Sequence, residues 1–342
     1  MPELIFSAAA LQLLSAAALA FSVLIYVLLD GTDLGVGMLY AFNRAEADRQ
    51  VMTLSLLPVW DGNETWLVLG GGGLLALFPA AYAILLSALY LPVFLMLLAL
   101  IARGMAIEYR DRADPQKRWR FDLMLMGGSA LAAAGQGVIM GTFIQGIPHD
   151  GAHYTGGGWE WLGVFPLFCG LALMAGYALL GACWLIWRTE GMLQARARAL
   201  ARRLGPLALA LVALLTLWTC GLHEEYRRHL SDLRFTLPAA LLLLAVAGGF
   251  RRALSARVAL LPLCLALGGV VLTFALLLLA VYPAMIPPRL SISAASSPPL
   301  SQGFVLIGFA VLIPITLAYN TFGFWVFRGK IHAQAKGPLS GK

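Results

Sequence analysis

Two groups of carboxylic acids could carry chemistry in this sequence. Asp61, Asn63 and Glu64 lie within four residues in "SLLPVWDGNETWLVLGGGGLLALFP", and Asp30 and Asp33 lie in "LLDGTDLGVGML". Apolar surroundings and a second nearby carboxylate both favour the protonated form of a carboxyl group. Acids in such surroundings could therefore accept and release protons.

The element that must position Asp61 is an apolar segment, residues 51–76, predicted to span the membrane. At about 1.5 Å per residue, Asp61 would lie about 15 Å deep, near the midplane. An ionisable group there costs at least about 2.5–3.5 kcal/mol and normally faces a protein interior or a water-filled path. Asp61 and Glu64 share a helical face, and Pro58 and Gly62 predict a kink or local opening.

Each polar group has two interpretations. The cluster around Asp61 and Asn63 either carries protons or ions, or it hydrogen-bonds a neighbouring chain and holds two helices together. Asp30 and Asp33, expected at the inner end of the first span, either cap that helix or take up protons from the cytoplasm. Arg103 either pairs with these acids or extends to the membrane interface.

The composition of the chain indicates a polytopic membrane protein. Of its 342 residues, 60% are hydrophobic and 12% are charged, whereas roughly a quarter of the residues in an ordinary soluble domain are charged. The net charge of +7 comes from basic residues in short blocks between apolar runs. This pattern is typical of cytoplasmic loops and argues against nucleic-acid binding.

Hydropathy predicts nine membrane-spanning helices, because about 20 apolar residues cross the hydrocarbon core. Their expected ranges are 7–29, 51–76, 80–102, 122–145, 161–187, 205–222, 235–250, 257–282 and 303–327. With the N-terminus outside, the outer segments contain only Arg227, Arg228, Arg234 and Arg289, and the other 20 of the 24 Lys and Arg residues lie on the inner side. Basic residues concentrate in cytoplasmic loops, so the N-terminus is expected in the periplasm and the C-terminus in the cytoplasm.

The expected fold is all-α, with two four-helix bundles and one peripheral helix. Residues 1–145 would form the first bundle, with both acidic motifs, and residues 146–282 the second. Residues 283–342 would supply an outer loop, the ninth helix and a basic cytoplasmic tail. Glycine-rich patches such as Gly70 to Gly73 would let helices approach closely.

The histidines predict that this chain holds no redox metal by itself. All five are expected in loops or the tail, namely His149, His153, His223, His229 and His332. Membrane haem and copper centres are usually held by histidines within the spans. We therefore expect no metal site and no cofactor bound by this chain alone.

The motifs resemble those of subunit II of the cytochrome bd-type quinol oxidases. The resemblance rests on "LLDGTDLGVGML", on "WDGNETWLVLGGGGLLALFPAAYA", and on Arg103 followed by "EYR". It is specific over about the first 150 residues, whereas the C-terminal half matches in hydropathy and length. The short outer loops suggest the cyanide-insensitive branch.

The resemblance implies a bacterial inner-membrane complex that oxidises quinol and reduces dioxygen to water, with proton uptake from the cytoplasm. A haem-bearing subunit I would hold haems b and d, or b only. Further expected partners are a single-span small subunit, a bound quinone or lipid, and membrane lipid. This chain would supply stability and proton and oxygen access, with no catalytic residue of its own.

The resemblance also implies roles for individual residues. Asp61 aligns with an acid on a proton route toward the haems, and Asp30, Asp33 and Glu64 are further candidates for that route. Glu64 stands where some members have an uncharged residue, and Arg112 where some have a lysine, so its charge is kept without an easily titrated group. The candidates for oxygen access or the subunit interface are Trp60, Asn63, Trp66, Arg103 and Arg112; Trp66 aligns with a tryptophan near an oxygen route.

The acidic residues are also compatible with a different class of protein. An ion-coupled secondary transporter uses broken helices and polar groups near the midplane. Partnership separates the two hypotheses, because a transporter should be active alone, whereas an oxidase subunit should co-purify with a haem protein.

Overall fold

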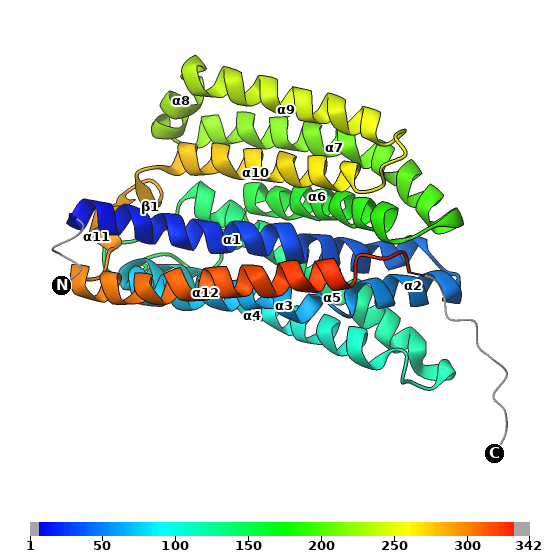
Figure 1. Cartoon of the computed structure of the whole chain (residues 1–342). Helices are drawn as coiled ribbons and strands as arrows, with labels where there is room; N and C mark the ends of the chain where they lie inside the picture. Colours follow the sequence, from blue (N-terminus) through cyan, green and yellow to red (C-terminus); the bar gives the residue numbers. More distant parts are fainter. Residues whose placement is uncertain (1–6, 332–342) are drawn as a thin grey trace, which may run out of the picture.

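The computed structural model describes residues 7–331 as a helical bundle with one small hairpin (Figure 1). Its long helices are α1 (Ala8–Leu39), α3 (Trp60–Leu77), α4 (Pro79–Tyr109), α5 (Arg118–Gln145), α6 (Val164–Arg188), α7 (Gly191–Leu222), α9 (Leu233–Ala253), α10 (Leu261–Val281) and α12 (Pro299–Val326). The shorter ones are α2 (Glu46–Leu56), α8 (Glu224–Ser231) and α11 (Ile292–Ala295), with single 3-10 turns at Tyr40–Phe42, Pro115–Lys117 and Glu160–Leu162. Strands β1 (Ala284–Ile286) and β2 (Leu290–Ser291) pair antiparallel.

Eight helices in the described residues are long and apolar enough to cross a membrane: α1, α4, α5, α6, α7, α9, α10 and α12. They correspond to eight of the nine predicted spans. The remaining one, residues 51–76, is divided between α2 and α3, and α3 is not among the eight. The N-terminal part of α3 carries Asp61, Asn63 and Glu64, and its middle contains Gly70 to Gly73, which explains its lower hydropathy.

The predicted break near Pro58 is confirmed, so the helix from which the depth of Asp61 was counted is not continuous, and that depth stays a prediction. Helix α2 ends at Leu56, and α3 begins at Trp60. Pro58 has no N–H with which to continue the helix, and its ring would clash with the carbonyl of Leu54 one turn earlier. Asp61 therefore lies in the first turn of a new helix, not ten residues inside a continuous span.

The predicted end of the first span near residue 29 is also wrong. Helix α1 continues to Leu39 and passes through Asp30 and Asp33, which are both buried. Glycine-rich sequence is a poor helix former in isolation, but here it lets α1 lie directly against α6. A Cβ on Gly35 would overlap the backbone of Tyr177 in α6. The two acids are therefore interior residues of α1 and do not cap its end.

The helices form two neighbouring groups. Helix α1 packs against α3 and α5, and α4 packs against α3 and α5. The second group contains α6, α7, α9 and α10, and α6 joins it to α1 and α5, while α12 packs on α3 and α1. The predicted division at residues 145 and 282 stays a prediction, and His332, Lys336 and Lys342 of the basic tail lie outside the described residues.

The two ends of the bundle differ in character. The start of α1, the hairpin strand β1 and α11 lie at one end, and α2 lies at the other (Figure 1). The connections from α6 to α7 and from α9 to α10 also lie at the α2 end. These are predicted inner segments, so the basic connections gather at one end of the molecule.

Candidate functional site

A buried ion pair between α1 and α4 is the centre of the site. The Arg103 guanidinium donates through Nη2 to the Asp30 carboxylate. The Arg103 and Asp30 side chains are 0% and 1% exposed, respectively. A buried charge requires a partner, because removing an ion from water costs several kcal/mol. Arg103 therefore pairs with the acids and does not extend to the interface.

Glu64 extends the ion pair to α3. Its Oε1 lies 3.4 Å from Arg103 Nη1, and its side chain is 28% exposed. One guanidinium thus links α1, α3 and α4. Within the described residues, Asp30 Oδ2 and Arg103 Nε and Nη1 are buried without a hydrogen bond. Buried polar atoms are normally satisfied by protein or by water, so the cluster has capacity to bind water.

Asp33 forms the second buried contact, between α1 and α3. The Asn63 side-chain amide donates to Asp33 Oδ2 at 2.7 Å, and both residues are 1% exposed. Helix α3 buries Gly62, Asn63 and Trp66 at helical spacing. Asn63 therefore faces α1, because it lies on the inward stripe of α3.

Asp61 and Glu64 differ in exposure on this chain alone, and their burial together against another polypeptide stays a prediction. Asp61 lies on the exposed surface of the chain, whereas Glu64 lies beside Arg103. The inward stripe of α3 includes Gly62, Trp66, Gly70 and Gly73, and neither Asp61 nor Glu64 belongs to it. The same-face argument used spacing alone and could not tell which face packs.

The remaining predicted residues occupy two places. Trp66 is fully buried and makes an edge contact with Phe21, with ring centroids 6.0 Å apart. Trp60 Nε1 donates to Glu108 Oε1 at 3.4 Å. The Arg112 side chain is 72% exposed, and its Nη2 lies 4.0 Å from Glu108 Oε2. Arg112 is therefore a surface residue far less enclosed than Arg103.

Sequence reasoning missed a polar chain that starts one turn from Asp30. The Gln136 amide donates to the Tyr26 hydroxyl at 2.8 Å, and the Tyr177 hydroxyl donates to Gln136 Oε1 at 2.7 Å. Tyr26 and Asp30 are four residues apart and lie on one face of α1. A glutamine within the apolar span 122–145 was the signal available in the sequence.

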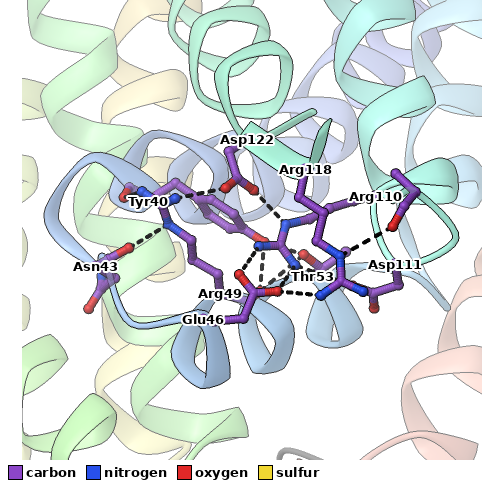
Figure 2. A network of polar contacts seen from close by, with 10 residues as sticks. Tyr40, Asn43, Glu46, Arg49, Thr53, Arg110, Asp111, Arg118 and Asp122 are labelled. Atoms are coloured by element: carbon purple, nitrogen blue, oxygen red, sulfur yellow. Dashed lines mark hydrogen bonds and ion pairs between the residues drawn. The ribbon is translucent and has the colours of Figure 1, made fainter. Parts of the chain in front are cut away.

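A second missed network lies at the α2 end, and Figure 2 shows its members. Asp122 of α5 accepts from Arg110 Nε at 2.5 Å and from Arg49 Nη1 at 2.7 Å. Glu46 accepts from Arg110 Nη2 at 2.9 Å and from Arg118 Nη1 at 2.8 Å. The network ties α2 to the ends of α4 and α5. Its arginines were interpreted only as the basic content of inner loops.

This network predicts a pH-dependent contribution to stability. Burial raises the pKa of Glu46, but hydrogen bonds from Arg110 and Arg118 outweigh burial and lower that pKa below its ordinary value. A lowered pKa means that the contribution is present above the ordinary pKa of about 4.3 and is lost as pH falls through the folded-state value. Glu46→Gln should therefore lower the free energy of unfolding at pH 7 by less than about 1 kcal/mol, because Glu46 is 54% exposed, and the melting temperature should fall slightly.

The difference in melting temperature between wild type and Glu46→Gln should shrink as pH falls below 4, measured by thermal unfolding with intrinsic tryptophan fluorescence. Glu225→Gln is the control, because Glu225 is exposed on α8 and should show little effect at either pH. A difference that persists unchanged at low pH would contradict the assignment.

The fold defines an integral membrane protein of helical-bundle type. Its apolar core contains a few buried charged and polar groups. The chain belongs to the cytochrome bd terminal oxidase subunit II family, whose model matches residues 11–327. The family resemblance found in the acidic motifs is thereby confirmed.

Two relatives with similar sequences carry the name of the same subunit. The "Cytochrome bd-I ubiquinol oxidase subunit 2" of Escherichia coli (strain K12) is 34% identical over 201 residues, which cover 56% of this chain and 53% of that protein. The alignment thus spans about half the length of that relative. The "Cytochrome bd ubiquinol oxidase subunit 2" of Bacillus subtilis (strain 168) is 28% identical over 323 residues, 90% of this chain and 92% of that one.

A solved structure shares the fold. It is a chain of the bd oxidase from Geobacillus thermodenitrificans, with a TM-score of 0.78 and 16% sequence identity. The match covers 93% of this chain and 98% of that one. The likeness therefore extends over the whole helical bundle.

Proposed function

We propose that this chain is the non-haem subunit II of a respiratory terminal quinol oxidase in a bacterial inner membrane. The complex would couple quinol oxidation to the reduction of dioxygen to water. The required partner in this proposal is a haem-bearing subunit I. A single-span small subunit is a further proposed partner. The family match supports this function over that of an ion-coupled transporter.

The buried acids carry the proposal for what this chain contributes. Reduction of dioxygen to water consumes one proton for each electron, so protons must cross from the aqueous phase to a buried site. Asp30 and Asp33 lie on one helix at 1% exposure, beside Arg103 and Asn63. A fixed guanidinium keeps such acids inside the bundle, where their carboxylates can hold and release protons.

We propose the orientation of the chain from its charge. Helix α3 would be the ninth span, shortened to Trp60–Leu77 because α2 precedes it outside the membrane. The α2 end of the bundle would face the cytoplasm, since basic residues concentrate there. The N-terminus would then lie in the periplasm, and protons would reach Asp33 from the α2 end.

The histidines suit a subunit that leaves haem binding to its partner. His149, His153, His223 and His229 all lie outside the eight candidate spans. Haem supplies the electron transfer and oxygen chemistry of such a complex. In this proposal the haems, b and d or b only, belong to subunit I, and the residues of this chain hold protons and fill the interface.

A large cavity supports the proposal of a bound quinone or lipid. Its volume is about 1480 Å³, and it lies between the two helix groups, with lining residues from α1, α6, α7, α9 and α10. Tyr26, Gln136 and Tyr177 add polar atoms to a mostly apolar wall, which also includes Arg202 and Arg251. A mostly apolar pocket with a few polar groups suits a long apolar molecule with a polar head.

Asp33→Asn tests the proton role most directly. Asparagine keeps the shape and can still accept from Asn63, but it cannot release a proton. We expect quinol-driven oxygen reduction by the purified complex to fall by roughly 100-fold or more, with unchanged haem content. Unchanged turnover at unchanged haem content would remove Asp33 from the route.

Asp61 and the tryptophans complete the proposed routes. Because Asp61 is exposed on this chain alone, we propose that it faces subunit I and passes protons across that interface. Trp60, Trp66 and Arg112 remain candidates for oxygen access or the interface. Asp61→Asn should slow turnover without loss of haem if this acid conducts protons, whereas loss of the assembled complex would indicate a structural role.

A further inference from the structure

A second cavity lies where α2 breaks from α3. Its volume is about 260 Å³, and its walls include Val59, Gly62 and Asn63 on one side and Asn320 and Gly323 of α12 on the other. One water requires roughly 10–15 Å³ of such volume. The cavity is therefore large enough for several water molecules.

The wall of this cavity carries a buried amide that lacks a hydrogen-bond partner. Asn320 is 8% exposed, and its Nδ2 is buried without a hydrogen bond in the described part of the chain. Asn63, which also lines the cavity, is 1% exposed and donates one N–H to Asp33. A buried amide without a partner is destabilising, so water in the cavity would supply the missing hydrogen bond.

Two features of the sequence shape this wall. Pro58 follows the end of α2 and separates it from α3, because proline cannot continue a helix. Gly62 lets α12 approach closely, since a Cβ there would lie 2.9 Å from Asn320 Oδ1. The break and the glycine together place the two asparagines around one small space.

We propose that this cavity is a water-filled inlet that brings water from the α2 end of the bundle to within one side chain of Asp33. Asn320 and Asn63 are positioning residues that hold the water by hydrogen bonds. This proposal rests on the proposed proton route and adds its entrance, on the α12 side of α3. A lipid acyl chain or an apolar side chain of a partner would be the competing occupant, because Tyr319, Phe322 and Phe327 form an exposed aromatic rim.

Cysteine labelling of the complex in membrane vesicles tests the inlet. Val59→Cys places a thiol on the cavity wall, and Val36→Cys is the matched control, because Val36 is 0% exposed and lies in the packed core. The probe is a permanently cationic methanethiosulfonate applied from the α2 side. Mass spectrometry of the labelled peptides separates these sites from the free native cysteines 169, 183, 220 and 264.

We expect residue 59 to react at least about tenfold faster than residue 36. Asn320→Leu in the Val59→Cys background should slow the reaction about tenfold by filling the space. Gly323→Ile is a second block that does not depend on Asn320, since a Cβ at Gly323 meets no atom within 4 Å. Reaction of residue 59 with an uncharged maleimide but not with the cationic reagent would identify an apolar occupant and overturn the proposal.

Equal rates at residues 59 and 36, or a rate at residue 59 that neither block changes, would also overturn it. The labelling needs no turnover, so it is independent of the oxidase assignment. Oxygen consumption by the same vesicles is measured separately. Its absence in wild type would contradict the proposed function, while the labelling would still decide the inlet.

Discussion

Replacement of Arg103 by methionine is expected to destabilise the chain by about 3–5 kcal/mol, the usual result of leaving a buried charge without its partner. Asp30 would lose the guanidinium that it contacts, and Glu64 would lose its 3.4 Å neighbour. We expect a large fall in the melting temperature and in the yield of assembled complex. Thermal unfolding monitored by tryptophan fluorescence measures the first, and size-exclusion chromatography the second.

The double variant Arg103→Met with Asp30→Asn separates charge from packing. Removing both charges should recover a large part of the lost stability, because a buried pair is often replaceable as a unit. Arg112→Met is the matched surface control, since Arg112 is 72% exposed, and it should change stability by at most about 1 kcal/mol. Equal effects at residues 103 and 112 would contradict the buried assignment.

Gly35→Ala should have the second large effect, because it separates α1 from α6. A methyl group at Gly35 would overlap the Tyr177 carbonyl and come within 2.7 Å of the Gly181 backbone nitrogen. Backbone atoms cannot rotate away as a side chain can, so the helices must move apart. Overpacking of this kind costs about 1–3 kcal/mol or more, and the fall in melting temperature of the complex measures it.

Gly71→Ala is the matched control, and we expect it to increase stability instead of lowering it. Gly71 also lies within a helix, but a Cβ there meets no atom within 4 Å. Alanine should then stabilise the isolated helix by roughly 0.5–1 kcal/mol, because glycine loses more backbone freedom on folding. A loss of assembly with subunit I in Gly71→Ala would instead indicate that the partner packs on this open face of α3. A Gly35→Ala variant as stable as wild type would contradict the α1 to α6 contact.

The sequence was most informative about elements whose physics is local. Apolar runs predicted the long helices, because a span needs about 20 apolar residues. Pro58 predicted the break, because proline cannot continue a helix. The acidic motifs also located the important region, since Asp30, Asp33, Asn63 and Glu64 lie close to one another or to Arg103.

The failures concern properties that depend on packing between helices. The depth of Asp61 was counted from an unbroken helix, whereas α2 ends at Leu56 and α3 begins at Trp60. Which face of α3 turns inward depends on the shapes of α1 and α12, which no local pattern contains. The extension of α1 beyond Asp33 has the same cause, because a glycine-rich segment is helical only when a neighbouring helix packs against it.

The networks missed by sequence reasoning join residues that are far apart in the chain. Arg49 and Asp122 are 73 positions apart, and Asn63 and Asp33 are 30 apart. The cavity at the α2 to α3 break likewise requires Asn320, from the last helix. Positions of charge along the sequence indicated loops, whereas the structure shows which of those charges meet.

The central claim is that this chain works only as part of a haem-bearing quinol oxidase. The most direct test is the visible absorption spectrum of the complex purified from native membranes through a tag on this chain, recorded with its quinol-driven oxygen consumption. We expect a haem Soret band that co-elutes with the chain and with oxygen consumption. A pure, folded chain without Soret absorbance and without oxygen consumption would contradict the account.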